Sequence, residues 1–163
     1  MKPSAANGDV AKIHAWFERL AAFVRAVDFE GARTIFAEDM IAFGTFSDFL
    51  VGRAAVEEKQ WRSVWPNIAD FRWNLAEAQA LVSDDRLLAV GMACFDSTGF
   101  ERDGSRYHRP GRATVALRRA DPADDWVAYH THMSLFRGVP QQSFRREGGK
   151  MCDEDIGERP IND

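Results

Sequence analysis

Two hydrophobic periods divide this chain into a helical first part and a stranded second part. Between residues 9 and 27 the apolar side chains recur at spacings of three and four, which predicts a helix with one buried stripe made of Ile13, Trp16, Phe17, Leu20, Val24 and Val27. Asp9 is predicted to cap this helix. A second, shorter helix is predicted from residue 29 to an end near residues 37–39, and a third runs from residue 52 until Pro66 ends it.

From residue 71 onward the apolar period changes to two. Phe71, Trp73 and Leu75 alternate with polar residues, and the segments LLAVGMACF, RATVALRR and WVAYHTHMSLF then predict long strands, separated by turn-forming residues. Helices followed by a run of antiparallel strands predict an α+β fold in which the N-terminal helices cover one face of a curved sheet. A sheet that wraps around helices in this way encloses a pocket.

The length of 163 residues fits a single domain. We expect an N-terminal extension at 1–8, the domain at 9–138 and a polar tail at 139–163, which is either mobile or lies across a partner subunit. With 45% hydrophobic and 28% charged residues, the composition is that of a globular protein. No apolar run approaches the roughly 20 residues of a membrane span, so no membrane partner is predicted.

Charge and cysteine content narrow the possible partners and the compartment. The net charge of −4 is spread along the chain without a basic face, which excludes nucleic acid as a partner. The first ten residues hold one lysine and no apolar core, so they do not form a secretory signal. Cys94 and Cys152 are too few for a disulfide scaffold or a cysteine zinc site. We therefore expect a cytoplasmic protein.

Four segments carry a resemblance to a known family: AVDFEGARTIFAEDMIAFG, LVGRAAVEEKQW, GRATVALRR and the closing HTHMSLFRG. In this order, over residues 9–138, they resemble the nuclear transport factor 2-like superfamily, in particular its SnoaL-like and ketosteroid isomerase-like branch. The resemblance implies a cone-shaped, cystatin-like fold with a deep pocket, often in a homodimer built through the sheet. It does not fix a function, because the fold hosts isomerases, dehydratases, cyclases, hydrolases and binding proteins.

Ketosteroid isomerases of this branch use a carboxylate base, a tyrosine and a protonated aspartic acid. Lining this sequence up with their pattern puts Gly44 at the position of the base and Leu20 at that of the tyrosine, and Thr114 lies near the third position. All three groups are replaced. The sequence therefore does not predict steroid isomerisation by that mechanism.

The closing strand contains His130 and His132, separated by one residue. The register implied by the resemblance sends His132, Ser134 and Phe136 into the pocket, and the strand period adds His130. On the neighbouring strand, Arg112 and Thr114 are the suggested companions, and an inward arginine favours an anionic or carbonyl-bearing ligand.

Three interpretations of the histidine pair stay open. They could bind a metal, with His108 or Asp48 as a third ligand, although no ligand cluster of suitable spacing supports this. They could transfer protons, with Asp48 or a serine orienting the imidazole. They could also form a hydrogen-bonded polar network, or bind a ligand without turnover. We predict no metal, and no cofactor either, because the sequence has no phosphate loop or dinucleotide fingerprint.

The sequence thus predicts a protein that binds a small, largely apolar ligand bearing a carbonyl, hydroxyl or carboxylate. The alternative is a cofactor-free isomerase, dehydratase or cyclase that uses His132 for proton transfer. Catalytic candidates are His132, His130 and Asp48. The candidate ligand-binding residues are Trp16, Leu20, Phe46, Trp61, Trp65, Met92, Arg112, Thr114, Ser134 and Phe136.

Overall fold

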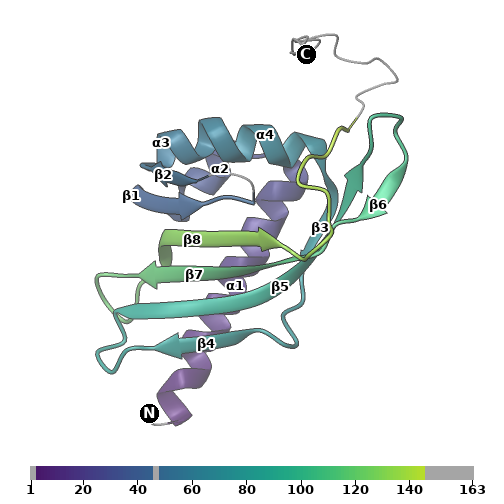
Figure 1. The fold of residues 1–163 in the computed structure, drawn as a ribbon. Helices are drawn as coiled ribbons and strands as arrows, with labels where there is room; N and C mark the ends of the chain where they lie inside the picture. The colour runs from purple at the N-terminus through teal and green to yellow at the C-terminus, as the bar shows by residue number, and fades with distance from the viewer. Residues whose placement is uncertain (1–2, 46–47, 146–163) are drawn as a thin grey trace.

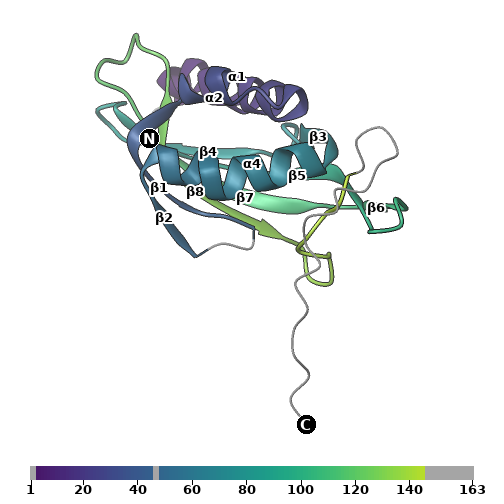
Figure 2. The same ribbon diagram turned by 90° about the horizontal axis from the view of Figure 1, so that it is seen from above.

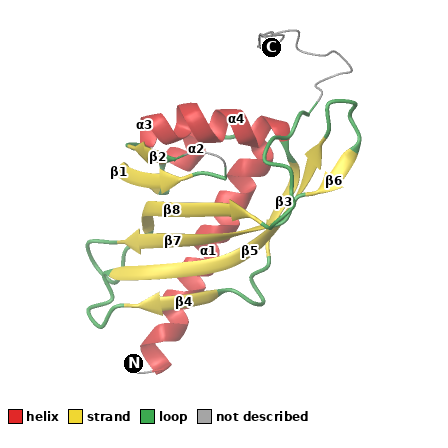
Figure 3. Cartoon of the chain, in the orientation of Figure 1, coloured by secondary structure: helices red, strands yellow, loops and turns green. Residues whose placement is uncertain are grey.

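Helices pack on one face of an eight-stranded sheet with the order β2-β1-β8-β7-β5-β3, in which β4 and β6 also pair with β5 (Figures 1 and 3). The computed structural model describes residues 3–45 and 48–145. The long helix α1 crosses behind the sheet in Figure 1, and α3 and α4 lie on the same side of the sheet (Figure 2). The predicted α+β fold class is confirmed.

The sheet is mixed, whereas the sequence suggested an antiparallel meander. Strands β1 and β8 pair in parallel, and all other strand pairs are antiparallel among the described residues. The strands are β1 (Phe36–Phe43), β2 (Phe49–Val51), β3 (Ala69–Trp73), β4 (Gln79–Val82), β5 (Leu88–Phe100), β6 (Arg106–His108), β7 (Gly111–Arg118) and β8 (Val127–Leu135).

The helices differ from the prediction at their ends. Helix α1 spans Pro3–Ala26, so it begins before the expected cap at Asp9, and α2 is limited to Phe29–Arg33 because the chain enters β1 at Phe36. The third helical segment consists of α3 (Arg53–Val56), a π turn (Glu57–Trp61), α4 (Arg62–Val64) and a 3-10 turn (Trp65–Asn67) that contains Pro66. No helix of the described residues is long and apolar enough to cross a membrane.

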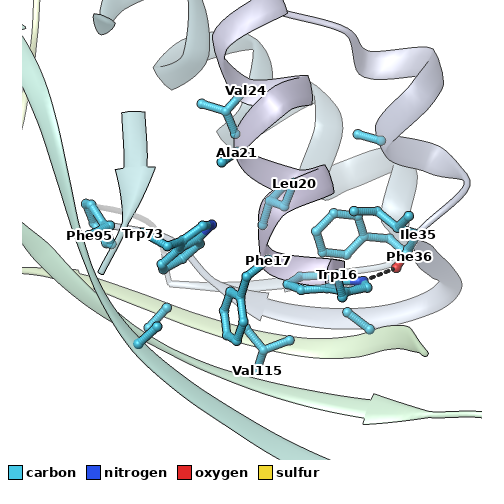
Figure 4. Packing of buried hydrophobic residues seen from close by; sticks show 14 of the residues in the cluster. Trp16, Phe17, Leu20, Ala21, Val24, Ile35, Phe36, Trp73, Phe95 and Val115 are labelled. Carbon is cyan, nitrogen blue, oxygen red and sulfur yellow. Dashed lines mark hydrogen bonds between the residues drawn. The ribbon is translucent and has the colours of Figure 1, made fainter. Parts of the chain in front are cut away.

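The apolar stripe of α1 packs against the concave face of the sheet (Figure 4). Trp16 and Phe17 are completely buried, and the Trp16 indole N–H donates a hydrogen bond of 3.0 Å to the Ile35 carbonyl. A Cβ at position 91 would lie 2.9 Å from the Phe17 ring, so Gly91 in β5 lets the helix approach the sheet closely. The predicted stripe therefore forms the centre of the core.

Asp9 does not cap α1 but lies within it, buried with 2% of its surface exposed. Its carboxylate accepts hydrogen bonds from Arg86 Nε at 2.7 Å and from Arg119 Nη2 at 2.6 Å. Hydrogen bonding from Arg86, together with Arg119, lowers the pKa of Asp9 from 3.8 to about 2, although burial opposes this change. The Arg119 guanidinium also lies 3.9 Å from the centroid of the Trp126 ring. These contacts join α1 to the turns that flank β5 and β7.

We predict that Asp9→Asn lowers the free energy of unfolding at pH 7 by about 3 kcal/mol, because it leaves Arg119 buried without an anion. A carboxylate with a lowered pKa stabilises the fold above its unfolded pKa of 3.8 and loses that contribution, about 2 kcal/mol, as the pH falls towards 2. The acid-induced loss of stability should therefore be smaller in the variant. Urea unfolding followed by tryptophan fluorescence measures both effects.

Asp125→Asn is the matched control. This carboxylate is exposed, with ion-pair distances of 4.0 Å to Lys12 and 3.7 Å to Arg19, so its removal should change stability by less than about 0.5 kcal/mol. Equal effects of the two substitutions would contradict the assigned role of Asp9.

Candidate functional site

A pocket lies between α1, the α3–α4 segment and the concave face of the sheet. Its inner volume is about 50 Å³. Most of its wall is apolar and consists of Leu20, Val24, Phe36, Trp61, Val64, Trp65, Ile68, Phe71, Phe95 and Met133. Such a wall favours a small ligand with an apolar body.

Stacked aromatic rings make up the helical side of this wall. The rings of Trp61 and Trp65 stack with centroids 5.0 Å apart and an interplanar angle of 16°. Phe29 also stacks on Trp65, with centroids 5.5 Å apart, and the Arg62 guanidinium lies 4.5 Å from the centroid of Phe29. Stacked rings form a rigid surface against which an apolar ligand can pack.

Arg109 brings a cation into this apolar wall. The residue lies between β6 and β7, and its backbone is fixed by Ser97: the Arg109 N–H donates to the Ser97 carbonyl, and the Ser97 hydroxyl donates to the Arg109 carbonyl, both at 2.8 Å. Only 2% of Arg109 is exposed. Its Nη2 lies 3.5 Å from Thr45 Oγ1, its Nε has no hydrogen-bond partner, and no carboxylate of residues 3–45 or 48–145 forms an ion pair with it.

The electrostatics of Arg109 follow from this burial. Desolvation lowers the pKa of the guanidinium, and the nearby Tyr107 phenol opposes that change. Arginine nevertheless stays protonated in proteins. A buried cation without a counter-ion is costly, so an anion that enters the pocket gains more from Arg109 than it would from a solvated side chain.

Three further polar groups line the pocket: Thr45, Gln60 and Thr131. Gln60 lies in the π turn and is 7% exposed, and its buried Oε1 has no hydrogen-bond partner. Two residues of the pocket wall therefore each carry a buried atom without a hydrogen-bond partner, the donor Arg109 Nε and the acceptor Gln60 Oε1.

Of the predicted ligand-binding residues, Leu20, Trp61 and Trp65 lie in the wall of the pocket. Their contact with a ligand stays a prediction. Trp16 is buried deeper in the core, where its indole bonds to the Ile35 carbonyl. Phe46 lies outside the described residues.

The predicted inward orientation of the histidines is wrong. Thr131 and Met133 of β8 line the pocket, so His130 and His132 point to the opposite, outer face of the sheet. There the two imidazoles contact the Phe43 ring, with centroids 5.9 Å and 5.2 Å away. Proton transfer by His132 inside this pocket is therefore not supported by the geometry.

The other predicted polar companions also lie on the outer face. Thr114 pairs with His132 and with Met92 across the strands, whereas Ser134 pairs with Arg112, which lies over the Phe136 ring. Asp48 is exposed just before β2. The predicted site residues that are exposed or half-buried and do not line the pocket are Met92, Arg112, Thr114, Ser134, Phe136 and Asp48. They can act on a ligand only at a surface other than this pocket.

The metal interpretation gains no support from the arrangement of possible ligands. His108 Nε2 lies 2.6 Å from an Asp96 carboxylate oxygen on the β5–β6 hairpin. Within the described ranges there is no group of three or more His, Cys, Asp or Glu residues placed to hold a metal ion.

The error in orientation amounts to one residue of register. A strand that shifts by one residue exchanges its two faces, and β8 has an irregularity between its pairs with Ala116 and Leu117. The alternation of Met133 and Leu135 with His132 and Ser134 indicated the observed orientation, but the register taken from the resemblance reversed it.

Sequence reasoning missed Arg109 and Gln60. Arg109 stands between His108 and Pro110, a setting typical of an exposed turn, and Gln60 belongs to the polar run EEKQ at the start of a helix. Neither pattern signals burial. Only the folded structure brings the two side chains into one cavity.

Comparison with known families agrees with this fold. Residues 13–138 match the model of the SnoaL-like domain. The chain belongs to the SnoaL-like domain family. No curated protein matches it significantly.

Solved structures of the nuclear transport factor 2-like superfamily share the fold. A ketosteroid isomerase-like protein from Erwinia carotovora atroseptica is 17% identical, with a TM-score of 0.67 over 80% of this chain and 98% of that chain. An NTF2-like superfamily protein from Salmonella enterica is 15% identical, with a TM-score of 0.66 over 95% and 99%. An NTF2-like protein with a cystatin-like fold from Novosphingobium aromaticivorans is 21% identical, with a TM-score of 0.63 over 82% and 86%.

We predict that Arg109→Met leaves the free energy of unfolding of the ligand-free protein unchanged or raises it by about 1–3 kcal/mol, because the substitution removes a buried cation without an anionic partner. Arg119→Met is the matched control, since Arg119 is equally inaccessible but pairs with Asp9; it should destabilise by about 3 kcal/mol. Urea unfolding measures both. Equal destabilisation would assign Arg109 a purely structural role.

Proposed function

We propose that this SnoaL-like protein binds a small, largely apolar carboxylate in its pocket, with Arg109 as the anchor for the anionic head. The observation that carries the proposal is the buried Arg109 guanidinium, which has an unpartnered Nε and lies in an otherwise largely apolar wall. The stacked rings of Trp61 and Trp65 would contact the apolar body of the ligand.

A carboxylate fits Arg109 better than a carbonyl or a hydroxyl does. All three can accept a hydrogen bond from a guanidinium N–H, but only an anion also compensates the buried charge. The planar guanidinium can in addition donate two parallel hydrogen bonds to a carboxylate. The inner volume of about 50 Å³ is well below the ~150 Å³ of a cavity that holds benzene, so the pocket limits the apolar body to a short alkyl chain.

We predict that propionate and butyrate bind the purified protein, whereas their neutral amides, propionamide and butyramide, bind more weakly. Arg109→Met should weaken carboxylate binding about 10- to 100-fold, which is the range expected for a charge-assisted hydrogen bond. Titration calorimetry measures the affinity, and quenching of tryptophan fluorescence reports contact with Trp61 and Trp65.

Arg112→Met is the matched control, because Arg112 lies on the outer face over the Phe136 ring. It removes the same charge from the chain without touching the pocket, so binding should not change. Carboxylate binding that survives Arg109→Met, or an equal loss in both variants, would contradict the proposed anchor.

We also propose that a second copy of the chain covers the outer face of the sheet. One row of paired residues crosses this face through Leu81, Val90, Ala116, His130, Ile41 and Val51. The row is apolar except for the histidine, and three of its members are well exposed: Ile41 at 38%, Leu81 at 56% and Val51 at 69%. A continuous apolar row on an open sheet face favours association with another protein surface.

We predict that sedimentation at micromolar concentration finds a dimer, and that Ala116→Arg converts it to a monomer by placing a charge at the centre of the row. Lys59→Glu, which changes an exposed side chain on the π turn, should leave the dimer intact. A wild-type monomer would contradict the proposal, and a dimer that persists in Ala116→Arg would assign the contact to another surface.

A further inference from the structure

Gln60 provides a second polar contact in the pocket that the anchoring of a carboxylate by Arg109 does not use. Its Oε1 is buried and has no hydrogen-bond partner, although nearly all buried polar atoms in proteins have one. A lone acceptor in a pocket wall lowers stability unless a bound molecule supplies a donor. The position of Gln60 therefore raises the question of which ligand group it faces.

Gln60 lies in a π turn of the helical segment. The Arg62 N–H donates to the Glu57 carbonyl, five residues back, instead of to the residue four back as in an α-helix. Gln60 and Trp61 of this turn both line the pocket. The Ser63 hydroxyl lies within 3.0 Å of the Lys59 and Gln60 carbonyls, to which it can donate. Single π turns inside helices are frequent at functional sites.

The start of the π turn is fixed by charge. Glu57 is buried, and its carboxylate accepts hydrogen bonds from Arg33 Nε and Nη2, both at 2.7 Å, and from Arg62 Nη2 at 2.6 Å. These bonds, chiefly those from Arg33, lower the pKa of Glu57 from 4.5 to about 2. The carboxylate therefore stays charged at neutral pH and ties the turn to α2 through Arg33. The Gln60 amide is consequently held on a rigid support.

We infer that Gln60 Oε1 accepts a hydrogen bond from a hydroxyl group of the carboxylate that Arg109 anchors, so that the pocket selects hydroxy acids with an apolar body. This inference rests on the proposed function. Both residues line one narrow pocket, so a small ligand that enters it lies near both side chains. A protonated amine would also donate to Gln60, but the described residues of the pocket wall include no carboxylate to balance its charge beside Arg109.

The test compares carboxylates that differ by one hydroxyl group. Propionate is compared with lactate and 3-hydroxypropionate, and butyrate with its 2- and 3-hydroxy derivatives, by calorimetric titration. At least one hydroxy acid should bind about tenfold more tightly than its parent, as expected for one net hydrogen bond. Gln60→Met, which keeps the length of the side chain but removes the acceptor, should abolish this preference, so that the hydroxy acid and its parent bind with equal affinity.

Lys59→Met is the matched control, because this neighbour on the same turn is exposed and should retain the preference. Binding of the parent acid by Gln60→Met verifies that the variant is folded; if it does not fold, Gln60→Leu replaces it. If the wild-type protein binds carboxylates without preferring the hydroxy acid, or if Gln60→Met keeps that preference, this inference is wrong while the proposed function stands. Failure of every carboxylate to bind the wild-type protein overturns the proposed function and this inference with it.

Discussion

The packing of α1 against the concave face of the sheet determines where everything else in this protein lies. Trp16 and Phe17 fill the space between helix and sheet, and Gly91 removes the one side chain that would hold them apart. The Asp9 contacts with Arg86 and Arg119 fix the helix against the flanking turns. Because α1 covers only part of the curved sheet, the α3–α4 segment must cover the remainder, and the pocket lies where these two helical segments and the sheet meet.

The pocket combines a well-packed wall with two polar groups that the protein itself leaves unsatisfied. The aromatic stack from Phe29 through Trp65 to Trp61 follows the usual rules of core packing. Arg109 Nε and Gln60 Oε1 break the rule that buried polar atoms are hydrogen-bonded. Proteins tolerate such exceptions mainly where function requires them. Three other buried nitrogens among the described residues, on His14, Trp73 and Trp126, also lack a hydrogen-bond partner, but only Arg109 and Gln60 line the pocket. Their chemistry therefore describes a ligand better than the overall shape of the pocket does.

The sequence predicted the architecture well because hydrophobic periods report which face of an element is buried. The stripe from Ile13 to Val24 and the strands that became β5, β7 and β8 followed from spacing alone. The prediction from the sequence failed where burial depends on distant contacts. Phe36 fits the apolar stripe of a helix as well as the alternation of a strand, so the sequence did not predict β1. Arg109 carries no local signal of burial, since sheet and helices enclose it only after folding.

The two buried arginines show that the fold can neutralise a guanidinium where stability requires it. Arg119 is fully enclosed, pairs with Asp9 at 2.6 Å and lies over the Trp126 ring. Arg109 is buried to nearly the same extent, yet among the described residues its side chain has only the Thr45 hydroxyl at 3.5 Å and the Tyr107 phenol nearby, and no carboxylate. Arg119 faces a permanent carboxylate between α1 and two turns, whereas Arg109 faces a cavity. In the proposed function the anion of Arg109 comes from a ligand, and a ligand that binds the native state alone shifts the folding equilibrium towards that state.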